Sequence, residues 1–244
     1  MGKTLIEILE QFENNKKNWK GTWNENAVAE CFMDCAIDLL CNGYFEVTWT
    51  RSENEKIITE KRIIDIGCIE LYYHEEESDI KDPIMYHTND RGSYSQFCDV
   101  FPYYEFGSFN LHTSGVDVTF ENEKEKYRAS FLIRAYRVLK DKTELKNAKK
   151  YDGRSSYIFD NMFPLGVCFE SQNFKIEWKY CFIKSEGIER CKRKNVPEYK
   201  DENGKYTIDP KRNRGGVKYI RTKPKEDRNW GYKLKGITIV NGKI

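Results

Sequence analysis

The sequence predicts a single α+β domain, and three features lead to that prediction. The chain has 244 residues, of which 39% are hydrophobic and 14% aromatic, which is enough apolar mass for one sizeable core. Helical patterns come first and strand-like patterns follow. No internal repeat or low-complexity linker divides the chain. We therefore expect residues 1–244 to form one unit, with 1–22 as an N-terminal helical extension and 205–244 as a basic C-terminal part.

Two helices are predicted near the N-terminus. Residues 4–14 repeat apolar side chains at helical spacing. A second helix is expected to begin at Asn24 or Asn26, because asparagine is a favourable N-cap. It should end at Asn42-Gly43, a common helix C-terminus.

Strand patterns follow the second helix. Residues 45–49 alternate apolar and polar side chains, 51–56 are a polar turn, and 57–73 form a longer strand. A helix that leads into a β-hairpin is therefore expected. Residues 101–120 are aromatic and strand-like, and 129–138 are typical of a buried strand.

The remaining elements are less regular. Residues 140–156 are polar and expected to be helical in part. Two more strands are predicted around Val167 and Ile176.

The eight cysteines are expected to be reduced, buried thiols. None forms a CxxC pair, and no histidine stands at zinc-finger spacing from them. We therefore expect no metal and no cofactor. The N-terminus does not resemble a signal peptide, and no apolar run approaches a membrane span. These features predict a cytoplasmic protein without a membrane partner, associated with the nucleoid if it is bacterial.

Positive charge is concentrated near the C-terminus. The formal net charge is only +2, yet residues 205–244 hold twelve Lys or Arg against three Asp or Glu. Trp230 and Tyr232 stand beside Arg228 and Lys233, and basic side chains interleaved with aromatic ones are suited to nucleic-acid backbones. The alternative interpretation is an ordinary basic surface.

Glu70 is the first candidate for chemistry. It follows an apolar strand and precedes Leu71-Tyr72-Tyr73. A carboxylate held among apolar and aromatic neighbours can serve as a base. The alternative is a glutamate on the outer face of a half-exposed strand.

Two histidines and an arginine are further candidates. His87 follows an acidic loop and a proline turn, where a histidine is usually solvated or a capping residue. His112 lies in an aromatic segment bounded by glycines. Arg134 lies within the buried strand, where a charge needs a partner or points into a site. A structural salt bridge is the alternative for Arg134.

Together these pieces follow an order that resembles the alkyladenine (3-methylpurine) DNA glycosylases over roughly residues 25–140. The matching segments are Leu39-Leu40, Glu70-Leu71-Tyr72, His87, the aromatic run from Phe101 to Phe109, Val116-Asp117-Val118 and Leu132-Ile133-Arg134-Ala135. The resemblance implies a compact α+β domain with a mainly antiparallel, curved sheet flanked by helices. It also implies a hairpin that inserts a side chain into DNA.

The activity implied by the resemblance is that of a monofunctional DNA N-glycosylase. Such an enzyme flips a damaged or modified base out of double-stranded DNA and hydrolyses its glycosidic bond. Glu70, with His87, would activate the attacking water and leave an abasic site. The enzyme is expected to be a monomer. Excision repair and attack on modified foreign DNA are equally compatible with this activity.

The resemblance also implies roles for residues around the base. The substrate-binding residues would be Tyr72, stacked on the base, Tyr103 or Tyr104 as the opposite wall, and Asp117 and His112 in the pocket. The DNA-binding residues would be Phe106 as the inserted wedge, with Asn110 as its rival, together with Arg134, Arg228 and Lys233.

The chain departs from the family pattern at three places. Cys68 replaces an acidic residue, the segment between Tyr72 and His87 is longer, and Asp117 replaces an asparagine at the pocket floor. An ionised carboxylate accepts hydrogen bonds but cannot donate them. Asp117 would therefore favour a base with an exocyclic amine, or a bulky modified base.

Two other functions stay open. The first is a nucleic-acid-binding module without catalytic activity, which would need the basic residues and aromatics but not Glu70. The second is a metal-dependent nuclease with Asp65 and Glu70 as ligands. Their spacing of five along one strand places them on opposite faces, which disfavours it.

Overall fold

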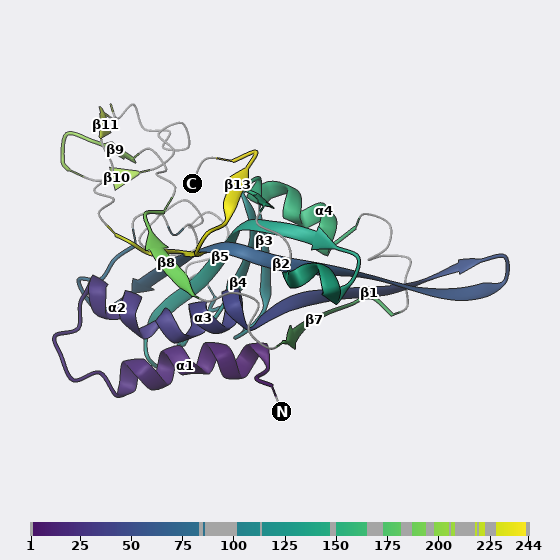
Figure 1. Cartoon of the computed structure of the whole chain (residues 1–244). Coiled ribbons are helices and arrows are strands. Elements are labelled where there is room, and N and C mark those ends of the chain that lie inside the picture. The colour runs from purple at the N-terminus through teal and green to yellow at the C-terminus, as the bar shows by residue number, and fades with distance from the viewer. Residues whose placement is uncertain are drawn as a thin grey trace.

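The computed structural model (Figure 1) combines helices with a large antiparallel sheet. The structure describes residues 2–82, 85, 102–112, 114–146, 150–164, 173–181, 187–193, 198–204, 206–207, 218, 220–222 and 228–242. The helices are α1 (Leu5–Lys17), α2 (Glu25–Cys31), α3 (Met33–Cys41) and α4 (Ile158–Met162), with 3-10 turns η2 (Lys142–Lys146) and η3 (Ser155–Tyr157). The strands are β1 (Gly43–Glu53), β2 (Lys56–Glu75), β3 (Phe109–His112), β4 (Gly115–Thr119), β5 (Tyr127–Leu139), β6 (Lys150–Asp152), β7 (Lys175–Tyr180), β8 (Ile188–Cys191), β9 (Glu198–Lys200), β10 (Tyr206–Thr207), β11 (Ile220–Thr222), β12 (Gly231–Leu234) and β13 (Thr238–Val240).

The N-terminal helices form where the sequence predicts them. Thr4 and Glu7 make a capping box at the start of α1, and Asn24 accepts hydrogen bonds from two backbone amides at the start of α2. The predicted second helix is divided at Phe32 into α2 and α3. Helix α1 contributes a fully buried apolar face to the core, Phe12 included, so it is an integral part of the fold.

The β1–β2 hairpin is longer than predicted. The segment expected to be a polar turn is mostly strand, because β1 continues to Glu53 and β2 begins at Lys56. Only Asn54 and Glu55 form the turn, and both have positive φ values, of 50° and 64°. Two consecutive residues of positive φ are the backbone of a type I′ turn, whose twist matches that of paired strands. Figure 1 shows this hairpin projecting as a ribbon beyond the body of the molecule.

Strand β2 is the centre of the large sheet. The order is β13-β6-β5-β2-β1-β7, with β12 also paired to β2, β8 to β12, β4 to β5 and β3 to β4. Among the described pairs, all are antiparallel except β13 with β6. The predicted α+β fold with a mainly antiparallel, curved sheet is therefore confirmed. A second sheet, with the order β10-β9-β11, lies apart from the large one (Figure 1).

The predicted buried strand and one of the two later strands are found as β5 and β7. Residues 129–138 lie within β5, and Ile176 lies in β7. Val167 lies outside the described residues.

Helices α1–α3 cover one face of the sheet, and this packing decides which side chains of β2 face the core. The ring of Tyr73 lies 5.4 Å from that of Phe12 in α1, and Ile69 and Leu71 are fully buried in the same core. Successive side chains of a strand point to opposite faces of the sheet. Glu70 and Tyr72 therefore project from the face that these helices do not cover. In the described part of the chain, no helix is both long and apolar enough to cross a membrane.

Candidate functional site

The candidate site is built on one row of residues that crosses six strands. Residues directly opposite one another on neighbouring strands project from the same face of a sheet. The row consists of Asn110 on β3, Asp117 on β4, Leu132 on β5, Glu70 on β2, Gly231 on β12 and Cys191 on β8. Residues distant in sequence are thus brought together on the face opposite α1–α3.

Glu70 lies at the centre of this row and is 1% exposed. Its Oε2 accepts a hydrogen bond of 3.0 Å from the Tyr72 hydroxyl, and its Oε1 lies 3.3 Å from Nε of Arg134. Burial, followed by the charge of Glu70, raises the pKa of Tyr72, so the phenol stays protonated and able to donate. The carboxylate is therefore held in one orientation by two side chains.

Arg134 is itself held in place by a hydrogen-bonded chain through Ser155. Its Nη1 donates to Oγ of Ser155 over 2.9 Å, and that hydroxyl donates to the carbonyl of Ser114 over 2.6 Å. Ser155 begins η3, and Ser114 lies in the turn of the β3–β4 hairpin. The guanidinium thus joins β5 to two connecting segments.

Asp117 forms the other acidic part of the site. It is 3% exposed, and its Oδ1 lies 3.3 Å from Nε2 of His112 on the neighbouring strand. The other ring nitrogen of His112 accepts a hydrogen bond from the backbone of Ser114. The sequence-predicted residues Glu70, Tyr72, Asp117, His112 and Arg134 therefore gather on one face.

Several buried polar atoms at this site lack a hydrogen-bond partner among the described residues. They are Nε and Nη2 of Arg134, Oδ1 of Asp117 and Oγ of Ser130, which lies opposite Tyr72 on β5. Buried polar groups are nearly always hydrogen-bonded, and those that are not need an explanation. Two of these atoms lie near an opposite charge without forming a hydrogen bond: Nε of Arg134 is 3.3 Å from Glu70, and Oδ1 of Asp117 is 3.3 Å from Nε2 of His112. Nη2 of Arg134 and Oγ of Ser130 have no such contact among the described residues.

Arg193 and Asp82 complete the site, although the sequence did not indicate them. Nη1 and Nη2 of Arg193 donate to the two oxygens of Asp82 over 2.6 and 3.2 Å. The guanidinium lies over the ring of Tyr72, with its carbon 4.8 Å from the ring centroid. One side of the Tyr72 ring is thus already occupied. Arg193 lies in a short irregular segment, which explains why periodicity could not reveal it.

Gly231 and two cysteines form the border of the site on the β12 side. A Cβ atom at Gly231 would lie 2.6 Å from Sγ of Cys191, so glycine is required for the thiol to occupy this place. Hydrogen bonding with Cys191, together with burial, raises the pKa of Cys68, which keeps that thiol neutral. Cys68 stands where the resemblance implies an acidic residue. Of the eight cysteines, Cys98 and Cys168 lie outside the described residues.

Tyr103 and Tyr104 do not lie beside Glu70. The ring of Tyr103 is stacked on Arg128, whose guanidinium carbon is 4.1 Å from the centroid. Arg128 pairs with His74, four residues from Glu70 along β2, which corresponds to about 13 Å. The backbone amide of Tyr104 donates to Glu121 over 2.8 Å. The expectation that either tyrosine faces Tyr72 across a base is not met by this arrangement.

The structure also separates Phe106 from the hairpin tip. Its ring packs edge-on against Phe120 of the core at 6.5 Å. Ser114 lies in the turn of the β3–β4 hairpin, next to the His112–Gly115 pair. A role as a DNA wedge would require Phe106 to leave the core. Asn110, its rival, lies on β3 opposite Asp117, in the row of the candidate site.

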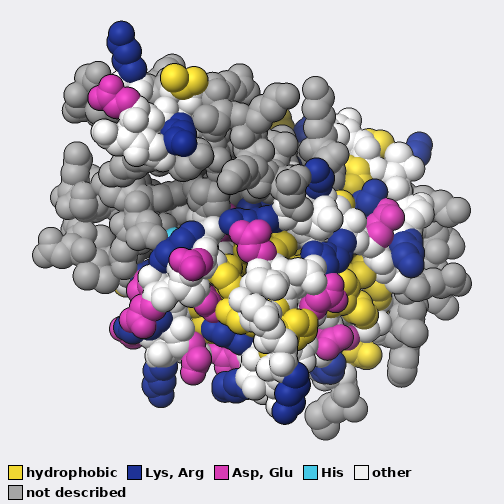
Figure 2. Space-filling model, turned by 90° about the vertical axis from the view of Figure 1, so that its left-hand side faces the viewer, with side chains coloured by type: hydrophobic (Ala, Val, Ile, Leu, Met, Phe, Trp, Pro, Cys, Tyr) yellow, Lys and Arg dark blue, Asp and Glu magenta, His cyan; other side chains and the backbone are white. Residues whose placement is uncertain are grey.

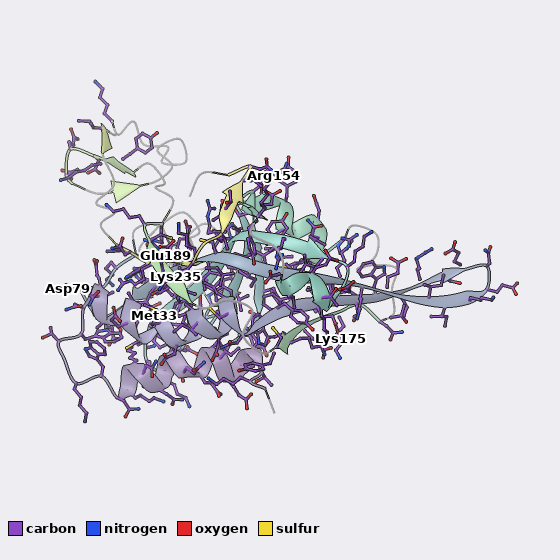
Figure 3. The ribbon with its side chains drawn as sticks, viewed as in Figure 1. Met33, Asp79, Arg154, Lys175, Glu189 and Lys235 are labelled. Carbon is purple, nitrogen blue, oxygen red and sulfur yellow. The ribbon has the colours of Figure 1, made fainter. Side chains whose placement is uncertain are left out.

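Both predicted phosphate-binding residues of the C-terminal part are ion-paired. Arg228 pairs with Glu25 and donates to the carbonyl of Lys81, and Nζ of Lys233 lies 3.1 Å from Glu189. Figure 3 labels Glu189 on β8. On the face shown in Figure 2, the described Lys and Arg side chains alternate with Asp and Glu. Charge is therefore largely balanced in the described part of this surface.

His87 lies outside the described residues, so its predicted role beside Glu70 stays a prediction. Asp65, the second metal ligand in the nuclease hypothesis, is instead engaged in hydrogen bonds with other side chains. Its Oδ2 accepts hydrogen bonds from Arg137 over 2.5 Å and from Tyr151 over 2.8 Å. Within the described residues, no cluster of three His, Cys, Asp or Glu side chains could hold a metal ion.

Comparisons with known proteins identify no relative. No family model, no curated protein and no solved structure matches this chain. The resemblance to the alkyladenine DNA glycosylases thus depends on the ordered residues in the sequence alone.

Proposed function

We propose that this chain is a monofunctional DNA glycosylase with Glu70 as its catalytic base. The observation that carries the proposal is a buried carboxylate that Tyr72 and Arg134 hold in place, on a face where further buried polar atoms make no hydrogen bond with the described residues. Convergent polar groups in a buried position are typical of a site that binds a polar ligand. The enzyme would act as a monomer in the cytoplasm, on double-stranded DNA and without a cofactor.

In this proposal Glu70 removes a proton from water. A general base must lie within hydrogen-bond reach of that water, and the water would bind Glu70 when the substrate enters the site. The water attacks C1′ of the deoxyribose while the bond to the base breaks, and the carboxylate stabilises the positive charge that develops on the sugar. Nη2 of Arg134, a buried donor without a partner among the described residues, would bind the sugar–phosphate nearby or the departing base.

Asp117 would select the base. Its Oδ1 is a buried acceptor that lies 3.3 Å from Nε2 of His112 without a hydrogen bond to it, and an exocyclic amine would supply a donor for this oxygen. Tyr72, adjacent to Glu70, offers one ring face to the base because Arg193 covers the other. These contacts favour a modified base that carries an amine.

Access is the strictest requirement of the proposal. Since Glu70 is 1% exposed, a nucleotide can reach it only after leaving the duplex stack and displacing the atoms that cover this face. Flipping a base costs a few kcal/mol, and least for a damaged or mismatched base. A buried carboxylate would therefore favour substrates whose bases leave the stack easily.

An abasic-site assay tests the proposal. Duplexes with hypoxanthine, ethenoadenine, 7-methylguanine or modified cytosines are incubated with the protein and then treated with hot alkali, with and without EDTA. We expect EDTA-resistant, alkali-dependent cleavage that falls at least about 100-fold in Glu70→Gln while DNA binding persists. Glu77→Gln is the matched control, because Glu77 is an exposed glutamate just after β2.

Two outcomes would replace the proposal. Tight duplex binding by the wild-type protein without abasic sites on any duplex would favour a binding module. Cleavage that EDTA abolishes would favour a metal-dependent nuclease.

A further inference from the structure

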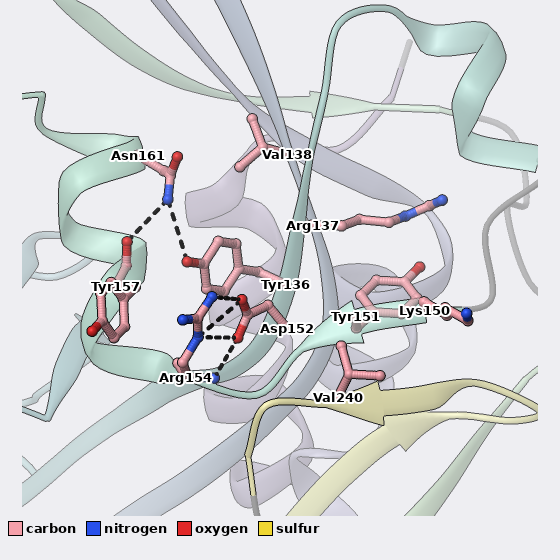
Figure 4. Close-up of a pocket in the computed structure, with 10 residues that line it drawn as sticks. All are labelled: Tyr136, Arg137, Val138, Lys150, Tyr151, Asp152, Arg154, Tyr157, Asn161 and Val240. Carbon is pink, nitrogen blue, oxygen red and sulfur yellow. Dashed lines mark hydrogen bonds and ion pairs between the residues drawn. The ribbon is translucent and has the colours of Figure 1, made fainter.

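A cavity away from Glu70 is lined by none of the predicted site residues. It has a volume of about 390 Å³, within the range of small-molecule sites. Figure 4 shows its lining, which comes from β5, β6, β13 and the segment that contains η3 and α4. The lining includes three tyrosines and three cations, namely Tyr136, Tyr151, Tyr157, Arg137, Lys150 and Arg154.

Arg154 is oriented by an acidic neighbour. Its Nε and Nη2 donate to the carboxylate of Asp152, over 3.1 and 2.6 Å, and the fork of contacts is visible in Figure 4. Its Nη1 makes no hydrogen bond with the described residues. The guanidinium carbon lies 4.5 Å from the ring centroid of Tyr157. The guanidinium of Arg154 is thus held in place, and its Nη1 can donate a hydrogen bond to a ligand.

Tyr157 provides an aromatic surface at the cavity. It is 51% exposed, which is high for a large ring that packs against an arginine. Tyr136 is more deeply placed, and its hydroxyl accepts a hydrogen bond of 3.3 Å from Asn161. An exposed ring beside a guanidinium is a favourable place for a planar, π-stacking group.

The charge of the lining favours an anion. Arg137 is neutralised by Asp65, and Arg154 by Asp152. Lys150 is exposed and has no ion-pair partner among the described residues, so its charge remains. Lys150 and Asp152 are two residues apart on β6, about 7 Å. In Figure 4 the Lys150 side chain extends away from Arg154 and Tyr157, so its charge acts on the cavity from the opposite end.

We propose that this cavity binds a nucleotide. The base stacks on Tyr157, Nη1 of Arg154 binds the phosphate, and Lys150 attracts the phosphate from the other end of the cavity without contacting it. The proposal does not depend on catalysis at Glu70. Ser155 nevertheless links the Glu70 site to this cavity, because it accepts a hydrogen bond from Arg134 and begins η3. The nucleotide can come from two sources, a free mononucleotide or a unit of a nucleic-acid strand.

Isothermal titration calorimetry on the full chain distinguishes these sources. The ligands are AMP, ribose 5-phosphate and a single-stranded DNA tetramer. We expect binding of AMP, of the tetramer, or of both, and weaker binding of ribose 5-phosphate because it lacks a base. AMP binding identifies a site for free nucleotides, whereas binding of the tetramer alone identifies a strand site.

Two variants test the assigned roles, and each has a matched control. Tyr157→Ala should weaken binding about tenfold, since stacking on an aromatic side chain contributes that much per base. Lys150→Ala should weaken it about fivefold at low salt and reduce its salt dependence. Tyr180→Ala and Lys124→Ala, exposed residues elsewhere on the chain, should bind as the wild type does. AMP binding by a protein that forms no abasic sites on any duplex would support this cavity and not the Glu70 proposal, so the two proposals can fail separately.

Three results would overturn the inference. One is the absence of binding by AMP and the tetramer at millimolar concentration. Another is equal binding of ribose 5-phosphate and AMP, which would exclude a stacked base. The last is wild-type affinity in both Tyr157→Ala and Lys150→Ala.

Discussion

Glu70 and Asp117 both stand directly opposite Leu132, one on each side of strand β5. Their side chains therefore project from the same face of the sheet. Their backbones are about 10 Å apart, which is twice the spacing of neighbouring strands. A molecule the size of a nucleobase can contact both carboxylates at once. In the proposed function, this separation would allow Glu70 to act on the sugar while Asp117 binds the base.

Asp117→Asn tests this division of roles. The amide adds donor hydrogens where the carboxylate has only acceptors, so bases with an acceptor at that position should gain and bases with an amine should lose. We expect the ratio of excision rates between such bases to change about tenfold or more. The measurement is the abasic-site assay on the same panel of duplexes.

The control for this change is Asp79→Asn, an exposed acid on the loop after β2. It should leave the order of substrates unchanged. If Asp117→Asn also leaves the order unchanged, Asp117 does not select the base.

Arg134→Met should strongly destabilise the fold. The change leaves the buried carboxylate of Glu70 without its cation, and an uncompensated buried charge costs about 3–5 kcal/mol. Replacing both members, Arg134→Met with Glu70→Leu, should recover most of that loss. Urea unfolding of the single and double variants gives the coupling energy.

Arg51→Met is the comparison for this experiment. Arg51 pairs with Glu53 and Glu60 near the tip of the hairpin, and its side chain is about half exposed. Solvent screens such pairs, so little change in stability is expected. A loss for Arg134→Met as small as that for Arg51→Met would show that the Glu70 site tolerates an unpaired charge.

Glu75 makes the stability of the fold sensitive to acid. Burial raises its pKa, but hydrogen bonds from Ser78, Tyr73 and Lys16 outweigh burial, and the pKa is lowered from its ordinary value of 4.5. A carboxyl group whose folded pKa is lowered stabilises the fold above its unfolded pKa. That stabilisation is lost as the pH falls through the folded pKa.

The difference in unfolding free energy between the wild type and Glu75→Gln should therefore be largest near pH 7 and shrink below pH 4.5. Urea unfolding at pH 7, 5 and 3.5 measures it. A difference that stays constant over this range would mean that the charge of Glu75 contributes nothing.

Local patterns in the sequence predicted the elements that hold the site. The apolar run around Arg134 is strand β5, and alternation along β2 places Glu70 and Tyr72 on one face. Asn24 was a sound helix start because its side chain can satisfy free backbone amides without help from the rest of the fold. Such features depend on a few consecutive residues, which a sequence displays directly.

Contacts between distant segments were not accessible in the same way. Arg228 looked like a phosphate ligand, but it pairs with Glu25, two hundred residues earlier in the chain. Tyr103 looked like a pocket wall, but the fold places it on Arg128. A side chain's charge or ring is visible in the sequence, whereas its partner is decided by the strand order.

Gly231→Ala should disturb the site from its border. The added Cβ would lie 2.6 Å from Sγ of Cys191 and 2.8 Å from its carbonyl oxygen, so either β8 or the thiol must move. Overpacking of this kind costs about 1–3 kcal/mol. Thermal unfolding measures the loss, and Gly21→Ala is the control, because its nearest neighbour is the flexible side chain of Trp19 at 3.2 Å.

A second change shows which contact is responsible. Combining Gly231→Ala with Cys191→Ala removes the clash with sulfur but not the clash with the carbonyl, so only part of the stability should return. Because Gly231 stands opposite Glu70, base release should fall in Gly231→Ala by more than the loss of folded protein explains. Unchanged stability in Gly231→Ala would show that β8 can move away from β12 at little cost, and the close approach of Cys191 would then not define the border of the site.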